Sequence, residues 1–199
     1  MDRRQFFRRV THKATETAFD HVDEKLRARA AHWIRPPFAL PELDFLLKCT
    51  RCGDCQDACP HDVIFALAAR LGPDVVGTPA LDLATRGCHL CADYPCVAAC
   101  ESGALQLPEI EAEAGVPLPL LARVRVDTGT CLPFLGPECG ACVPACPVPG
   151  ALTLERERPV IHTELCPGCG LCREACIVEP PAIEVASRHR EAEPVVPPP

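Results

Sequence analysis

The chain has 199 residues, with 23 prolines and 12 glycines but only seven phenylalanines, one tryptophan and one tyrosine. This length allows one domain or two small ones, and so few aromatic side chains argue against a conventional aromatic-rich core. The formal net charge of −7 argues against nucleic acid or an anionic lipid surface as the main partner. No stretch approaches the roughly 20 apolar residues of a transmembrane helix, so we expect no transmembrane segment.

Residues 1–48 contain no cysteine and are expected to form an N-terminal helical extension. Apolar residues recur there at three- and four-residue steps, which predicts an amphipathic helix. These positions are Phe19, Val22, Leu26, Ala30 and Trp33. Pro36 and Pro37 end this helix, and a second helical segment at residues 40–48 leads into the first cysteine. The extension either packs on its own domain or docks a partner, and the sequence leaves both open.

Sixteen cysteines then fall into four motifs, at residues 49–60, 88–100, 131–147 and 166–176. The first and fourth motifs share the spacing C-x2-C-x2-C-x3-C, the second lengthens its middle gap to four residues, and the third delays its second cysteine. The sixteen are Cys49, Cys52, Cys55, Cys59, Cys88, Cys91, Cys96, Cys100, Cys131, Cys139, Cys142, Cys146, Cys166, Cys169, Cys172 and Cys176.

This spacing is typical of bacterial ferredoxins, in which three thiolates hold one iron–sulfur cluster and the fourth cysteine ligates a neighbouring cluster. Four motifs with no cysteine left over predict four [4Fe–4S] clusters, held by all sixteen thiolates. Structural zinc usually takes two C-x2-C pairs separated by a longer loop, so it fits the spacing less well. A disulfide framework requires an oxidising compartment.

Short stretches typical of strands flank the motifs. They lie at residues 63–67, 80–84, 103–107, 124–127, 150–154, 160–163 and 182–185. Together they predict an α+β fold in residues 49–187: two pseudo-symmetric, bacterial-ferredoxin-like units of βαβ repeats built around the clusters. Residues 188–199, acidic and then proline-rich, are expected to be a disordered tail. The motifs can pair in tandem, first with second and third with fourth, or nested, and strand counting does not decide between the two.

Several segments between Arg35 and Ala186 resemble the ferredoxin-type NapG/MauM family, of which NapF is a close relative. The lead-in R-P-P-x-A-L-P-E-x-D-F precedes C-T-R-C-G-D-C, and the second motif reads G-C-H-L-C through Y-P-C-V. The later motifs contain C-L-P-F-L-G-P-E-C-G-A-C and C-P-G-C-G-L-C-R-E-A-C-I-V-E-P-P-A-I. The unusual spacings of the second and third motifs recur in the family, which makes the resemblance specific.

The resemblance implies an electron-transfer protein of anaerobic respiration. NapG-like members pass quinol-derived electrons toward periplasmic nitrate reductase, and MauM-like members accompany methylamine dehydrogenase. The implied partner is a redox protein, either an oxidoreductase or a membrane quinol-oxidising subunit. NapF-like members instead assist maturation of a molybdoenzyme, so a maturation or assembly factor with structural or redox-sensing clusters is the alternative.

The second motif also resembles the four-cluster subunits of the dimethyl sulfoxide reductase family, which pair their motifs in nested fashion. That resemblance favours nested pairing here. Cys59 is then expected beside Cys166, Cys169 and Cys172, and Cys100 beside the first three cysteines of the third motif.

The residues from Asp2 to Arg9 resemble the first half of a twin-arginine export signal. A working signal continues with an apolar stretch, whereas residues 11–35 carry many charged side chains. We therefore expect a cytoplasmic protein, with twin-arginine export to the periplasm as the alternative. No phosphate-binding loop, dinucleotide fingerprint or haem motif is present, so we expect an electron carrier or accessory subunit rather than an enzyme. His61, His89 and His162 are expected near the clusters but not as ligands.

Overall fold

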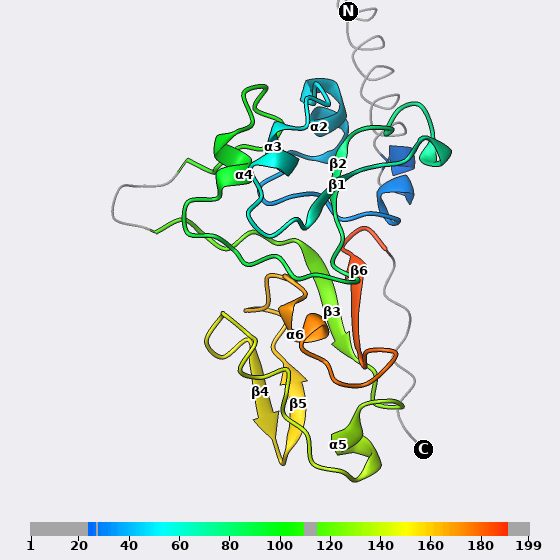
Figure 1. Ribbon diagram of the computed structural model, residues 1–199, viewed down its shortest axis with the longest axis vertical. Helices are drawn as coiled ribbons and strands as arrows, with labels where there is room; N and C mark the ends of the chain where they lie inside the picture. Colours follow the sequence, from blue (N-terminus) through cyan, green and yellow to red (C-terminus); the bar gives the residue numbers. More distant parts are fainter. Residues whose placement is uncertain (1–23, 27, 110–114, 191–199) are drawn as a thin grey trace, which may run out of the picture.

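The computed structural model describes residues 24–26, 28–109 and 115–190 (Figure 1). Its helices and strands form two groups along the long axis of the molecule. The first group contains α2 (Glu42–Lys48), α3 (Asp54–Asp57), β1 (Ile64–Ala66), the 3-10 helix η1 (Ala69–Leu71), β2 (Pro79–Leu81) and α4 (Pro95–Ala98). The second contains β3 (Ala122–Val126), α5 (Leu132–Leu135), β4 (Leu152–Glu155), β5 (Arg158–Ile161), α6 (Leu171–Glu174) and β6 (Ile183–Ser187). We call them the first and second halves.

In the second half, two antiparallel strand pairs link the third and fourth motifs. Strand β3, which precedes the third motif, pairs with β6, which follows the fourth. Strands β4 and β5, which lie between the two motifs, pair with each other through a tight turn at Arg156 and Glu157. The third and fourth motifs are therefore enclosed by the same four strands.

The first half repeats this connection with shorter strands. Strands β1 and β2, between the first and second motifs, pair antiparallel. The lead-in to the first motif pairs with the segment after the second: Leu40 N–H donates to the Ala104 carbonyl at 3.1 Å, and Gln106 N–H donates to the Phe38 carbonyl at 3.0 Å. The strand expected at 103–107 is thus reduced to a single bridge, between Leu105 and Ala39. Residues 38–40 take the place of the strand that the sequence did not reveal before the first motif.

The fourth motif joins the two halves. The backbone N–H of Cys88 donates to the carbonyl of Cys169 at 2.7 Å, and Leu121 N–H donates to the carbonyl of Pro167 at 2.7 Å. Within the second half, the same motif packs against the start of β3. A Cβ atom on Gly168 would lie 2.1 Å from the Ala122 carbonyl oxygen, so only glycine allows this approach of the two backbones. Glu174 adds a carboxylate that accepts a 2.7 Å hydrogen bond from the Gly87 N–H.

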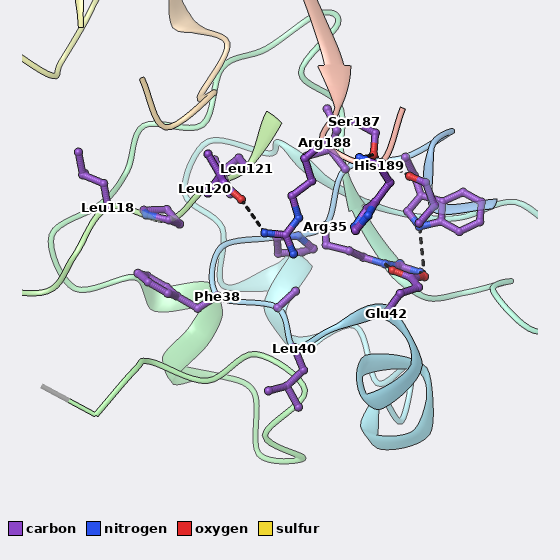
Figure 2. A pocket seen from close by; sticks show the side chains of 16 residues that line it. Arg35, Phe38, Leu40, Glu42, Leu118, Leu120, Leu121, Ser187, Arg188 and His189 are labelled. Carbon is purple, nitrogen blue, oxygen red and sulfur yellow. Dashed lines mark hydrogen bonds and ion pairs between the residues drawn. The ribbon is translucent and has the colours of Figure 1, made fainter. Parts of the chain in front are cut away.

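A buried ion pair stabilises the packing of the segment before α2 on the first half. Arg35 donates to both carboxylate oxygens of Glu42, whose side chain is 1% exposed, and to Thr78 Oγ1 at 2.8 Å. Its guanidinium also lies over the Phe45 ring, 4.5 Å from the centroid. Figure 2 shows Arg35 and Glu42 side by side at the edge of a cavity of about 250 Å³.

The helical extension is described only in part. Residues 24–26 and 28–30 are helical, and Ala30 and Trp33 are buried at 1% and 7% exposure. Phe19, Val22, the arginine pairs near the N-terminus and the tail at 191–199 lie outside the described residues.

Candidate iron–sulfur centres

One cavity brings three cysteines of the first motif together with the last cysteine of the second. Cys49 ends α2, Cys55 lies in α3, and Cys100 follows α4; with Cys52 they line a space of about 80 Å³. Gly53 precedes α3 in the left-handed conformation, with φ of 93°, and turns the chain between Cys52 and Cys55. Cys52 is exposed, whereas Cys55 is buried.

A second cavity has the reciprocal composition. Cys88, Cys91 and Cys96 of the second motif line a space of about 20 Å³ together with Cys59, the last cysteine of the first motif. Helices α3 and α4, which carry the two motifs, contact each other. The exchange of the fourth cysteine therefore follows from their packing.

The second half groups its thiols in the same reciprocal way. Burial raises the pKa of Cys131 to about 11, and the nearby thiols of Cys142, Cys176 and Cys139 add to the shift. Cys176, the last cysteine of the fourth motif, thus lies with three cysteines of the third.

The remaining thiols complete the pattern. Burial raises the pKa of Cys172 to about 12, with Cys169, Cys166, Cys142 and Cys146 adding to the shift. Cys146 also acts on Cys166 and on Cys169. The last cysteine of the third motif therefore lies with three cysteines of the fourth.

This grouping shows that the expectation of nested pairing was wrong. Cys59 lies beside the second motif, not the fourth, and Cys100 lies beside the first motif, not the third. The reason is the β1–β2 and β4–β5 pairings, which bring the first motif onto the second and the third onto the fourth. The turn between β4 and β5, at Arg156 and Glu157, carries no Asn-Gly or Asp-Gly signal in the sequence.

Burial keeps these thiols protonated in the absence of a positive partner. It raises the pKa of Cys96 to about 12 and that of Cys55, Cys88 and Cys169 to about 11. A buried thiolate is unfavourable unless a cation or hydrogen bonds stabilise it. These sites are therefore suited to thiolates that bind a metal, since metal ligation replaces the proton.

Backbone amides donate to equivalent sulfurs in the two halves. Leu105 N–H donates to Cys100 Sγ at 3.3 Å, and Ala182 N–H donates to Cys176 Sγ at 3.3 Å. Hydrogen bonds to ligand sulfur are one means by which proteins set the reduction potential of an iron–sulfur cluster.

Tetrahedral zinc, with Zn–S bonds of 2.3 Å, draws its four sulfurs to about 3.8 Å from one another. Among the described residues, no three His, Cys, Asp or Glu side chains are placed to hold a single metal ion.

Two of the three histidines expected near the clusters, His61 and His89, line the second cavity. His61 and His89 stack at the second cavity, with ring centroids 3.6 Å apart and planes inclined by 9°. His162 instead exchanges a 2.9 Å hydrogen bond with Thr153 Oγ1, between strands β4 and β5. No helix within the described residues has the length and apolar character needed to cross a membrane.

The fold and its cysteine groups define a ferredoxin-like iron–sulfur protein, and the 4Fe-4S binding domain family model matches residues 46–65. The chain is 35% identical to the ferredoxin-type protein NapG of Haemophilus influenzae, over 92% of this chain and 71% of that protein. It is 37% identical to the methylamine utilization ferredoxin-type protein MauM of Methylobacillus flagellatus, over 94% and 85%.

The ferredoxin-type protein NapF of Escherichia coli is more distant, at 27% identity over 81% of this chain and 90% of that protein. No solved structure matches the chain. The chain belongs to the NapG/MauM family of ferredoxin-type proteins.

Proposed function

We propose that this protein transfers electrons through four [4Fe–4S] clusters held by its sixteen cysteines. The observation that carries the proposal is the reciprocal exchange of fourth cysteines: Cys100 joins the first motif's cavity, and Cys59 joins the second motif's. This exchange is the arrangement of two-cluster ferredoxins. The same exchange by Cys146 and Cys176 supports a second pair of clusters.

The proposed ligand sets are numbered by motif. Cluster 1 is held by Cys49, Cys52, Cys55 and Cys100, and cluster 2 by Cys59, Cys88, Cys91 and Cys96. Cluster 3 is held by Cys131, Cys139, Cys142 and Cys176, and cluster 4 by Cys146, Cys166, Cys169 and Cys172. Each half is then one ferredoxin-like unit, and the matching strand pairings of the halves support a pseudo-symmetric repeat.

The four ligand sets form one row in the order 1, 2, 4, 3. Cys55 acts electrostatically on Cys96 across the first half, and Cys142 acts on Cys172 across the second. Cys88 and Cys169 join the two halves through their backbone hydrogen bond. Iron–sulfur clusters supply reversible one-electron transfer, and this row would place that chemistry along the length of the molecule.

The partner that fits such a row is a respiratory oxidoreductase or a membrane subunit that oxidises quinol. The MauM and NapG relatives support a periplasmic nitrate reductase or amine dehydrogenase system. The chain would act there as an electron carrier or accessory subunit. We place it in the cytoplasm, because the N-terminal arginine pairs are followed by charged residues, with twin-arginine export as the alternative.

Anaerobic reconstitution tests the cluster content. We expect about sixteen irons and sixteen acid-labile sulfides per chain, with broad absorbance near 400 nm that bleaches on reduction. Stoichiometric zinc without that absorbance would overturn the proposal. The alternative function is that of a maturation factor, which the similarity to NapF supports. Re-oxidation of the reduced protein by a partner oxidoreductase would distinguish electron transfer from this alternative. A maturation factor would bind the partner without exchanging electrons.

A further inference from the structure

A groove of about 880 Å³ runs along the β3–β6 sheet, and basic side chains dominate its lining. Among the described residues, five arginines line it against one carboxylate, that of Glu184. The arginines are Arg123, Arg125, Arg173, Arg188 and Arg190. This concentration of positive charge contrasts with the formal net charge of −7 of the whole chain. A groove of local positive charge on an acidic protein attracts an anionic partner.

The alternation of β3 places two of these arginines in the groove. The strand reads A-R-V-R-V, and Ala122 and Val124 are buried while Arg123 and Arg125 are exposed. Side chains alternate between the faces of a strand. Arg123 is paired in register with Ala186, and Arg125 with Glu184. One face of the sheet therefore packs into the core, and the opposite face carries the guanidinium groups.

Most of the groove's hydrogen bonds orient the arginines without neutralising them. Arg123 donates to the Arg190 carbonyl at 3.2 Å. Arg188 donates to the Leu120 carbonyl at 3.4 Å, as Figure 2 shows. Arg173 donates to the carbonyls of Ala84 and Ile183. Carbonyl oxygens carry no net charge, so these three guanidinium groups keep theirs. Among the described residues, Arg125 alone of these arginines forms an ion pair, with the carboxylate of Glu184.

The groove also contains a proposed cluster ligand and apolar contact surface. Cys166, of the ligand set of cluster 4, lines it. Leu120, whose side chain is 60% exposed, and Val185 add apolar surface to the same groove. A partner bound there would therefore lie against the fourth cysteine motif.

We propose that this groove docks an acidic segment of the redox partner protein and brings it to the ligand set of cluster 4. The inference rests on the proposed function for its electron-transfer role, but not for the binding of the acidic segment. A protein segment is favoured over a membrane or a nucleic acid because the positive charge is confined to a concave groove. An extended polyanion would also meet the acidic remainder of the chain.

Binding of a fluorescein-labelled decaglutamate peptide to the holoprotein, followed by anisotropy at low salt, tests the docking. We expect affinity that falls as salt is added, and a loss of about tenfold in the variant Arg123→Gln/Arg188→Gln. The matched control Arg70→Gln/Arg156→Gln removes two exposed arginines outside the groove and should stay within about twofold. Equal losses in the two variants would overturn the proposal, as would tighter groove-dependent binding of phosphatidylglycerol vesicles or a single-stranded oligonucleotide.

Electron transfer supplies the second measurement. The reduced holoprotein is oxidised by Co(EDTA)⁻, in which one electron passes from the protein to Co(III) and yields Co(II). We expect decaglutamate to slow this oxidation in the wild type and in the control variant, but not in Arg123→Gln/Arg188→Gln. If the arginines only offset the charge of a cluster, the groove variant shifts a reduction potential and binds the peptide normally, and the docking proposal fails. Zinc in place of iron and sulfide would instead defeat the proposed function, while peptide binding to the folded zinc protein would still report on the groove.

Discussion

The backbone N–H of Cys88 donates a hydrogen bond of 2.7 Å to the carbonyl oxygen of Cys169, so two cysteine motifs from opposite halves are joined directly through their main chains. The neighbouring contact between Gly87 and Leu171 holds the same two segments together, since a Cβ on Gly87 would lie 2.7 Å from the Leu171 Cα. The two halves thus pack backbone against backbone where the second motif meets the fourth.

We expect Gly168→Ala to destabilise the holoprotein severely. The substitution forces a left-handed alanine, at about 1–2 kcal/mol, and an overpacked contact, at about 1–3 kcal/mol. Gly103→Ala is the matched control, because Gly103 has a similar φ of 68° but no atom within 4 Å of an added Cβ. Anaerobic denaturant unfolding, followed by loss of cluster absorbance, measures both variants. Similar losses in the two would show that the close contact between Gly168 and Ala122 contributes nothing.

Double substitutions test the exchange of cysteines between motifs. Cys59→Ala should remove cluster 2 and lower the iron content from about sixteen to about twelve per chain. Cys59→Ala/Cys96→Ala should lose no more iron, since both residues belong to one proposed ligand set. Cys59→Ala/Cys55→Ala should lose two clusters and retain about eight irons. If the second and third variants were to exchange these results, each motif would hold its own cluster, contrary to the reciprocal cavities.

Breaking the buried ion pair should loosen the N-terminal segment. Glu42→Gln leaves the Arg35 guanidinium, whose side chain is 10% exposed, without its counter-charge. We expect the free energy of unfolding to fall by about 3–5 kcal/mol. Asp74→Asn is the control, because its pair with Arg29 is more than half exposed on both sides and should contribute at most about 1 kcal/mol. Guanidinium unfolding monitored by circular dichroism compares the variants, and equal effects would contradict the structural role of the buried pair.

Removal of iron should unfold much of the chain. The strands are three to five residues long and form three separate pairs among the described residues, and small cores of this kind usually need a metal for stability. Anaerobic chelation without denaturant should therefore abolish the strand signal in circular dichroism. An apoprotein that retains a cooperative thermal transition would show that its apolar core is sufficient.

The sequence predicted the strands close to the motifs better than it predicted the pairing of those motifs. Stretches at 63–67, 124–127 and 182–185 overlap β1, β3 and β6, because β-branched residues near fixed turns leave few alternatives. No strand was predicted at residues 38–40, because they lie among prolines and pair through only a few main-chain hydrogen bonds. Such a contact depends on the tertiary arrangement and leaves no periodic pattern.

Tandem pairing could not be predicted from cysteine spacing, which is the same under either scheme. It is decided by the β1–β2 and β4–β5 pairings, and their turns lack the Asn-Gly or Asp-Gly signal of a tight hairpin. The arginine groove could not be predicted from the sequence either, since its side chains come from β3, α6 and the segment after β6. Their convergence appears only once β3 pairs with β6.

Tandem pairing has a consequence for synthesis of the protein on the ribosome. Every proposed ligand of clusters 1 and 2 precedes residue 101, so the first half has its full set of thiols while the second half is still being made. At about 5–20 residues per second, the last ligand, Cys176, follows Cys100 by roughly 4–15 s. The nascent chain could therefore receive two clusters before the other two sites exist. Under nested pairing, Cys49, Cys52 and Cys55 would lack their fourth ligand until Cys176 was made, when translation was nearly finished.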